Sequence, residues 1–234
     1  MQLLGLQMQH SAVKVRVAER WIIKTQRLLS LWLGLLCLVT SPVQAEQLRV
    51  LIQTSLGDLV VELDENRSPA SVANFLAYLD DGRYTGTIFH RVIPEYVIQA
   101  GGHRVDMSEI EDHPPILNEA ENGLKNVTGT LAFARSNAID SATGQFFINL
   151  QDNGNLDHTV DSCTRADEQA QEKALARGLH KPIRCKTFGY AVFGRVVEGM
   201  SVVNAIASVE TRDHPDYADV PVTPIVIESI SRIH

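Results

Sequence analysis

The feature that most constrains the fold is a series of short apolar runs separated by turn-forming residues. Segments rich in Gly, Asn, Asp and Pro separate the runs, which occupy residues 49–54, 58–63, 87–93, 96–100, 129–134, 145–150, 190–197 and 225–233. Runs of this length and spacing are typical of antiparallel strands rather than of alternating strand and helix units. The pattern therefore predicts a mainly β domain, either a barrel or a sandwich.

Two segments have helical rather than strand periodicity. Ser68 precedes Pro69 in the way that an N-cap hydroxyl precedes a first-turn proline, and apolar residues follow at helical spacing until Gly82. Residues 200–208 show a second amphipathic pattern. No internal repeat or linker divides residues 46–234, so we expect one domain with two helices beside its strands.

The segment between Cys163 and Cys185 is predicted to be an insert with a surface helix. Residues 164–178 are rich in Ala, Glu, Gln and Lys, and Thr164 and Asp167 are spaced as in a capping box. Cys163 and Cys185 are the two cysteines after residue 45, and in an oxidising compartment they would form a disulfide at the base of the insert. The alternative is a pair of free thiols.

The first 45 residues have the organisation of a secretory signal peptide. Five basic residues and one acidic residue precede an uncharged apolar run at residues 28–40, and a small-residue pattern ends at Ala45. The alternative is an uncleaved membrane anchor, but a membrane-spanning helix needs about 20 apolar residues and this run is shorter. We expect cleavage after Ala45, export to the periplasm and no stable membrane association afterwards.

The acidic charge of the chain argues against nucleic acid as a partner. The sequence has 21 basic and 28 acidic residues, a net charge of −7, and without residues 1–45 the counts become 16 and 27, a net charge of −11. Nucleic-acid binders draw much of their affinity from basic residues that neutralise phosphates. We therefore expect no nucleic-acid partner.

Common catalytic and metal-binding signatures, among them GxGxxG, GxSxG, HExxH and CxxC, are absent from the sequence. Instead, Arg91, Gln99 and Gln145 interrupt otherwise apolar strand-like runs. Strand alternation would place Arg91 on the same face as Phe89, and Val97 on the same face as Gln99. It would group Tyr96 with Ile98 and Ala100 on the other face. An inward Arg91 would need a buried partner, whereas an Arg91 on an edge strand would be exposed, and the sequence is compatible with both.

Five motifs follow one another along the chain in a characteristic order. They are FHRVIPEYVIQAGG at residues 89–102, GTLAFAR at 129–135, GQFFIN at 144–149, LDH at 156–158 and FGYAVFGRVVEGM at 188–200. In these motifs the chain resembles the cyclophilins, a family of peptidyl-prolyl cis-trans isomerases, and is most similar to their exported bacterial branch. The resemblance spans about residues 48–233. It implies a closed eight-stranded antiparallel β-barrel capped by two α-helices, with a helical insert near residues 159–187.

The resemblance also implies an activity and the residues that carry it. A cyclophilin accelerates rotation about X-Pro peptide bonds and needs no metal or other cofactor. The implied catalytic residues are Arg91, Gln99 and Phe147, and the implied substrate-binding residues are Tyr96, Val97, Ala134, Arg135, Gln145, Leu156 and Tyr190. We expect a monomer that acts on proline-containing polypeptides and assists protein folding. The alternative is a non-catalytic chaperone module that binds proline-containing peptides.

The sequence departs from the family pattern in three places. Asn155 stands where many eukaryotic cyclophilins have Trp, so we expect weak binding of cyclosporin. Tyr190 stands where many eukaryotic cyclophilins have a pocket His, and the bacterial branch also has Tyr at this position. The insert at residues 159–187 is longer than we expect of an exported relative, and by the resemblance it lies beside the active site, where it could tune access of the substrate. The alternative is a solvated insert without a function of its own.

Overall fold

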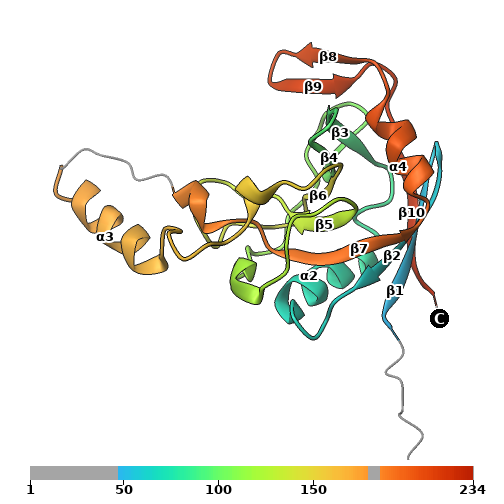
Figure 1. Cartoon of the computed structure of the whole chain (residues 1–234). Coiled ribbons are helices and arrows are strands. Elements are labelled where there is room, and N and C mark those ends of the chain that lie inside the picture. The colour runs from blue at the N-terminus through green and yellow to red at the C-terminus, as the bar shows by residue number, and fades with distance from the viewer. Residues whose placement is uncertain (1–46, 179–184, 234) are drawn as a thin grey trace, which may run out of the picture. The chain divides into compact units, whose positions relative to one another are not determined.

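The computed structural model describes residues 47–178 and 185–233, and its centre is a strongly curled antiparallel sheet (Figure 1). The sheet has eight strands in the order β10-β1-β2-β7-β5-β6-β4-β3. The strands are β1 (Arg49–Thr54), β2 (Gly57–Leu63), β3 (Thr87–Ile93), β4 (Val97–Arg104), β5 (Thr130–Phe133), β6 (Phe146–Asn149), β7 (Val192–Glu198) and β10 (Ile227–Ile233). The predicted mainly β, eight-stranded antiparallel fold is confirmed.

The two end strands of the sheet, β3 and β10, are joined by a short bridge rather than by a full ladder. The backbone N–H of Gly86 donates to the carbonyl of Ile227 over 2.9 Å, and that of Phe89 donates to the carbonyl of Ile225 over 2.9 Å. The predicted closed barrel is therefore a strongly curled sheet whose ends meet through these hydrogen bonds.

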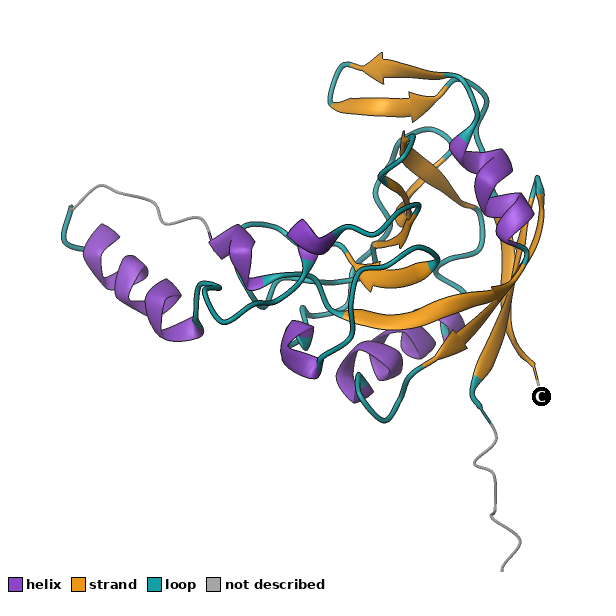
Figure 2. Cartoon of the chain, in the orientation of Figure 1, coloured by secondary structure: helices purple, strands orange, loops and turns teal. Residues whose placement is uncertain are grey.

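Alternation along the strands gives the sheet two apolar faces. One face, here called the core face, packs against the helices α2 (Pro69–Asp80) and α4 (Met200–Ala207), which Figure 2 shows beside the sheet. The opposite face, here called the site face, carries a separate apolar cluster of Val97, Ala132, Phe147, Leu156 and Val192. Because both faces are buried, these strands read in the sequence as nearly continuous apolar runs.

The start of α2 differs from the sequence prediction. Ser68 is the N-cap residue, but its side chain makes no capping hydrogen bond and instead donates to the carbonyl of Val192 over 2.7 Å. The carboxylate of Glu119, distant in sequence, accepts from the backbone N–H groups of Ala70 (3.0 Å) and Ser71 (2.8 Å). Glu119 therefore satisfies the free N–H groups at this helix end in place of Ser68.

The insert contains the predicted surface helix, α3 (Arg165–Leu175). Thr164 and Asp167 form the predicted capping box, and every residue of α3 is at least partly exposed. The helix lies away from the sheet in Figure 1, and its first turn is attached to the domain by an ion pair between Arg165 and Asp140 (2.9 Å).

The base of the insert is held by Cys163 and Cys185, which are joined as a disulfide with their Cα atoms 5.3 Å apart. Cys185 begins a short 3₁₀ helix, η3 (Cys185–Phe188), and its side chain is buried. It packs with Ala120, Ile139 and Phe188 in a small apolar cluster of its own.

One pair of strands was not predicted. β8 (Thr211–His214) and β9 (Tyr217–Pro221) form a two-stranded hairpin, and β9 lies beside β3. The ring of Tyr217 meets the ring of the buried His103 edge to face, with the centroids 4.7 Å apart. This contact docks the hairpin onto the eight-stranded sheet.

The predicted signal peptide, residues 1–45, and its cleavage point lie outside the described residues. Within the described part of the chain, no helix has the length and apolar character needed to cross a membrane.

Candidate active site

Nine of the ten predicted site residues line a single cavity of about 280 Å³. They are Arg91, Tyr96, Val97, Gln99, Ala134, Arg135, Phe147, Leu156 and Tyr190. The tenth, Gln145, lines an adjacent cavity of about 270 Å³ that shares Gln99, Ala134 and Arg135 with the first. The side-chain amide of Gln99 donates to that of Gln145 over 2.9 Å. The structure thus brings all ten residues to one place.

The floor of the cavity is formed by the site face of three neighbouring strands. Gln99 on β4 lies opposite Phe147 on β6, and Phe147 lies opposite Ala132 on β5. Val97 precedes Gln99 by two residues and shares its face, as the sequence predicts. Val97 and Phe147 are each only 4% exposed, so the floor is an apolar surface held rigidly by the sheet.

The walls come from segments outside the strands. Leu156 belongs to the 3₁₀ helix η2 (Gly154–Leu156), Tyr96 lies in the turn between β3 and β4, and Tyr190 lies just before β7. The rings of Tyr190 and Phe147 pack edge to face with their centroids 5.6 Å apart. Asn155 is exposed, and its amide donates to the Tyr96 hydroxyl over 3.5 Å at the rim of the cavity.

Arg91 lies on the site face, and the predicted sharing of a face with Phe89 is wrong. Phe89 is buried on the core face, whereas Arg91 lines the cavity. The reason is a bulge, because Phe89 pairs with Ala100 and Arg91 with Gln99, so two steps along β3 match one step along β4. Arg91 is thus a half-exposed side chain on an edge strand, one of the two arrangements compatible with the sequence.

The partner of Arg91 is a residue that the sequence analysis missed. The carboxylate of Asp219 on β9 lies 3.9 Å from Nε of Arg91, in an ion pair whose two side chains are 43% and 40% exposed. Asp219 has a φ of 59°, a left-handed conformation that Asp and Asn adopt more readily than most residues. No periodic pattern singled out this polar segment, so only its packing beside β3 reveals the contact.

Arg135 is held by the backbone at the base of the insert. Its Nε donates to the carbonyl of Gly189 and its Nη2 to that of Cys185, both over 2.9 Å. Its guanidinium also lies over the ring of Tyr190, 4.9 Å from the centroid. Burial lowers the pKa of Arg135, but an Arg stays charged at physiological pH. The disulfide-bonded base of the insert therefore directly contacts a residue of the cavity.

Two buried histidines lie behind the site. His90 and His103 are 3% and 2% exposed, and their rings lie 4.4 Å apart. Burial lowers the pKa of His90 to about 3 and also lowers the pKa of His103. Both are therefore neutral at physiological pH. The described residues contain no group of three or more His, Cys, Asp or Glu side chains placed to hold a metal ion.

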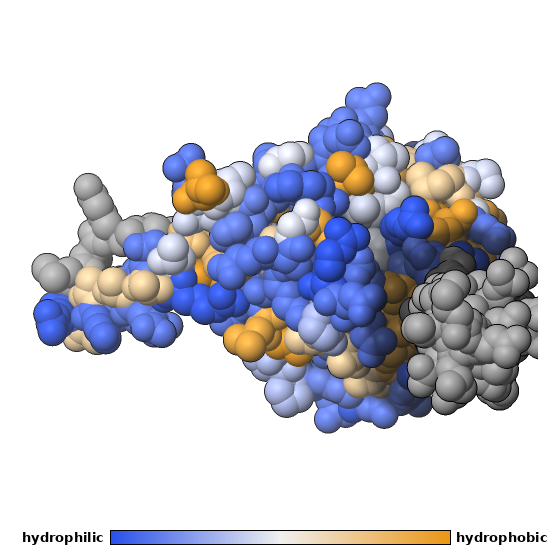
Figure 3. Space-filling model, turned by 60° about the horizontal axis from the view of Figure 1, so that its bottom comes forward, coloured by the Kyte–Doolittle hydropathy of each residue, from blue (hydrophilic) through white to orange (hydrophobic). Residues whose placement is uncertain are grey.

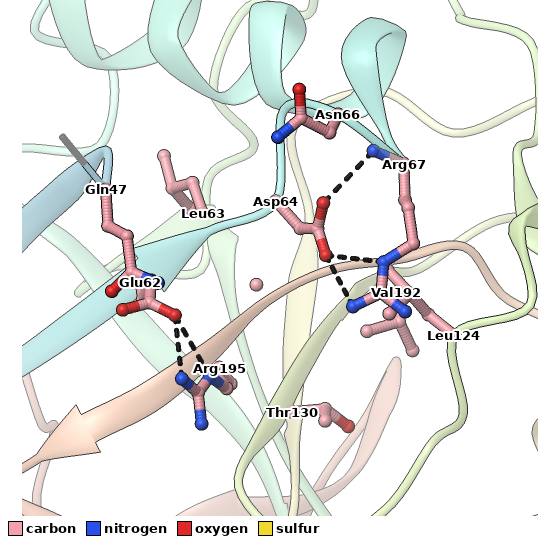
Figure 4. A pocket seen from close by; sticks show the side chains of 11 residues that line it. Gln47, Glu62, Leu63, Asp64, Asn66, Arg67, Leu124, Thr130, Val192 and Arg195 are labelled. Carbon is pink, nitrogen blue, oxygen red and sulfur yellow. Dashed lines mark hydrogen bonds and ion pairs between the residues drawn. The ribbon is translucent and has the colours of Figure 1, made fainter. Parts of the chain in front are cut away.

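A larger cavity, of about 360 Å³, lies elsewhere and contains none of the predicted site residues. Figure 4 shows that its charged side chains are paired with each other, Glu62 with Arg195 and Asp64 with Arg67. The face of the molecule in Figure 3 is mainly hydrophilic, with apolar residues in several small groups. The smaller cavity, which gathers nine of the predicted residues, is therefore a better candidate for the functional site than the larger one.

Comparison with known proteins assigns the family. Residues 49–232 match the family model described as cyclophilin type peptidyl-prolyl cis-trans isomerase/CLD. The chain belongs to the cyclophilin family. This cyclophilin is 44% identical over 180 residues to peptidyl-prolyl cis-trans isomerase A of Dickeya dadantii, and the aligned region covers 77% of this chain and 82% of that protein. It is 40% identical over 182 residues to peptidyl-prolyl cis-trans isomerase B of Escherichia coli, covering 78% of this chain and 98% of that protein.

A solved structure supports the same fold. A cyclophilin-type isomerase of Cryptosporidium parvum, determined in the presence of the dipeptide Ala-Pro, matches with a TM-score of 0.56 and 23% identity and covers 78% of this chain and 96% of that chain. The chain is thus a cyclophilin-type peptidyl-prolyl cis-trans isomerase, and the cavity on its site face is the candidate active site.

Proposed function

We propose that this cyclophilin accelerates rotation about X-Pro bonds in exported polypeptides and assists their folding in the periplasm. The observation that carries the proposal is the position of the Arg91 guanidinium at the edge of an apolar cavity floored by Phe147. The relative from Cryptosporidium parvum was determined with Ala-Pro, a dipeptide that ends in proline. A proline side chain is the small apolar ring that such a cavity suits.

The chemistry follows from the electronic structure of the peptide bond. Rotation is slow because the C–N bond has partial double-bond character, with a barrier of about 18–20 kcal/mol. A donor that binds the lone pair of the imide nitrogen weakens this character, and the lone pair is available only when the bond is twisted. Arg91 donates to that nitrogen and so stabilises the transition state more than either ground state.

The other residues hold the substrate while the bond rotates. Phe147, Leu156 and Tyr96 enclose the proline ring and keep it fixed. Gln99 and Gln145, joined by their amide hydrogen bond, and Arg135, held by backbone carbonyls, align the substrate backbone. The reaction forms no covalent bond, so positioned donors and an apolar ring pocket suffice for it.

Export is supported by the first 45 residues of the sequence. The basic segment, the apolar run and the small residues ending at Ala45 together form a signal peptide. Cleavage after Ala45 leaves Glu46 at the N-terminus, close to the start of β1 at Arg49. We propose that the mature protein acts in the periplasm as a monomer.

The activity is tested on the mature protein, residues 46–234, with a short X-Pro peptide whose cis and trans forms are followed by NMR exchange. Replacement of Arg91 by Ala should lower the rate about 100-fold or more, as is typical for loss of a transition-state donor, and leave the fold intact. Arg195→Ala is the matched control, because Arg195 is an exposed arginine that does not line the cavity. Equal rates for Arg91→Ala and the parent would disprove the role of Arg91.

The localisation has its own test. The full chain expressed in a bacterial host should appear in the periplasmic fraction with Glu46 as its first residue. Retention in the membrane with an intact N-terminus would favour the uncleaved anchor instead. In the activity assay, a parent that binds the peptide without accelerating its exchange would favour the non-catalytic binding module.

A further inference from the structure

Three asparagines that the catalytic mechanism does not use lie directly behind the proline cavity. Asn126 precedes β5, Asn149 ends β6, and Asn153 precedes η2. Their exposed fractions are 1%, 0% and 2%. Burial of an amide is unfavourable unless its donors and acceptors are satisfied, so three buried amides at one place call for partners.

The three side chains form a series of hydrogen bonds in which each amide nitrogen donates to the next side-chain oxygen. The amide nitrogen of Asn153 donates to the side-chain oxygen of Asn149 over 2.8 Å. The amide nitrogen of Asn149 in turn donates to the side-chain oxygen of Asn126 over 3.2 Å and to the hydroxyl of Thr130 over 3.0 Å. Each donor finds an oxygen, so the buried amides are paired with one another.

The asparagines at both ends of this series of hydrogen bonds donate to backbone carbonyls of residues that form the cavity walls. The amide nitrogen of Asn153 also donates to the carbonyl of Tyr96 over 2.9 Å. That of Asn126 donates to the carbonyl of Leu156 over 3.1 Å and lies 3.4 Å from the carbonyl of Tyr190. Tyr96, Leu156 and Tyr190 are the residues described above as the walls of the cavity.

The network therefore connects opposite sides of the cavity. The walls Leu156 and Tyr190 are already joined by a backbone hydrogen bond of 2.9 Å, and the carbonyl of Tyr96 also accepts from the backbone of Leu150 over 2.9 Å. The asparagine side chains add a link between these two groups. Asn149 stands at its middle, two residues after Phe147 on the same face of β6, and so lies beside the floor of the cavity.

We propose that Asn126, Asn149 and Asn153 form a positioning network that sets the separation of Tyr96 from Leu156 and Tyr190, and hence the fit of the cavity to the proline ring. The proposal rests on the proposed use of this cavity for proline. The three are positioning residues, since Asn126 and Asn153 donate to the backbone of the walls and Asn149 joins these two side chains. Burial of Asn126 also excludes it as a glycosylation acceptor in the folded protein, although residues 126–128 match the Asn-X-Thr pattern.

The experiment separates positioning from stability. Asn149→Ala breaks the middle of the network without removing a group that touches a wall carbonyl. Ile52→Val and Ile52→Ala are the controls, because Ile52 is fully buried on the core face in β1, away from the cavity. Thermal unfolding of the mature protein ranks the three variants by stability. Binding and exchange of an X-Pro peptide are then measured by NMR well below every melting temperature.

Asn149→Ala should raise the dissociation constant of the peptide about 2- to 30-fold, the range for residues that act on a site without touching its ligand. The exchange rate of the saturated complex should stay within about twofold of the parent, because Arg91 is untouched. The Ile52 variants should bind like the parent. Asn153→Ala removes the link to Tyr96 together with the hydrogen bond to Asn149, and leaves the bond between Asn149 and Asn126 in place. As a second variant it should weaken binding in the same way, with shifted Tyr96 ring resonances.

A dissociation constant for Asn149→Ala and Asn153→Ala equal to that of the Ile52 controls would overturn the proposal. A fall in the exchange rate without a change in binding would also overturn it, because the network would then act on Arg91 rather than on the cavity walls. If the parent binds the peptide but does not accelerate exchange, the proposed function fails, while the comparison of dissociation constants still tests the network.

Discussion

Reduction of the Cys163–Cys185 disulfide is expected to destabilise the whole domain and to weaken peptide binding. The two cysteines are 22 residues apart in the sequence. Closing a loop of that size removes chain entropy from the unfolded state that corresponds to about 3 kcal/mol. For a domain of this size, 1 kcal/mol shifts the melting temperature by about 2–4 °C, so reduction should lower it by roughly 6–12 °C.

The loss should reach the active site because of how Cys185 is packed. Its side chain is buried against Ile139 and Phe188, and its carbonyl accepts from the guanidinium of Arg135. Release of this end of the loop removes one of the backbone acceptors that hold Arg135 in the cavity. The affinity for an X-Pro peptide should therefore fall together with the melting temperature.

The assay is thermal unfolding of the mature protein, followed by circular dichroism with and without dithiothreitol. A Cys163→Ala/Cys185→Ala double variant should melt near the reduced protein and should not respond to the reductant. Thiol labelling of the oxidised, denatured protein should find no free thiol, and labelling after reduction should find two. A melting temperature that reduction leaves unchanged would refute the coupling of the insert to the domain, and two labelled thiols before reduction would refute the disulfide itself.

Two further predictions concern the neighbours of Arg91. Asp219→Asn removes the carboxylate beside Nε of Arg91 and should lower the isomerisation rate by no more than about fivefold, since exposed ion pairs contribute about 0.2–1 kcal/mol. Asp216→Asn is the control, because Asp216 is exposed. An isomerisation rate of Asp219→Asn above that of the parent would contradict a supporting role for Asp219. The pKa of His90, lowered to about 3 by burial, lies below the ordinary value of about 6.5, so the unfolded state binds more protons between these values. The free energy of unfolding, measured in urea, should therefore fall as the pH drops from about 6.5 towards 3. The fall should be less steep in His103→Phe, which removes the neighbouring histidine. A free energy of unfolding that does not depend on pH in this range would contradict the burial of neutral histidines.

The strands of the eight-stranded sheet could be predicted because they are buried on both faces. β4, β5, β6 and β7 alternate between the core face and the site face, and both faces are apolar, so each strand stands out as an apolar run. The β8–β9 hairpin has no such signal. Its strands are largely polar and partly exposed, and its position depends on the contact between Tyr217 and His103, which brings together residues far apart in the sequence.

The site residues were predicted by resemblance, whereas their faces were predicted by alternation, and alternation holds only where the strand is regular. On β4 it correctly places Val97 and Gln99 together on the site face and Ile98 and Ala100 on the core face. It wrongly groups Tyr96 with Ile98 and Ala100, because Tyr96 lies in the turn before the strand and lines the cavity. The supporting residues could not be predicted in this way. Asn126, Asn149 and Asn153 come from separate segments, and their hydrogen bonds exist only once the fold has brought these segments together.

The failure of alternation at Arg91 has a consequence for how the active site is built. Without the bulge, a guanidinium two residues after Phe89 would point into the core, where an unpaired charge is strongly destabilising. The extra step in β3 turns Arg91 outward to the cavity. His90, between Phe89 and Arg91, is buried, with its ring centroid 4.4 Å from that of His103. The bulge thus accounts for the face that Arg91 takes, and in the proposed mechanism it brings the guanidinium to the substrate.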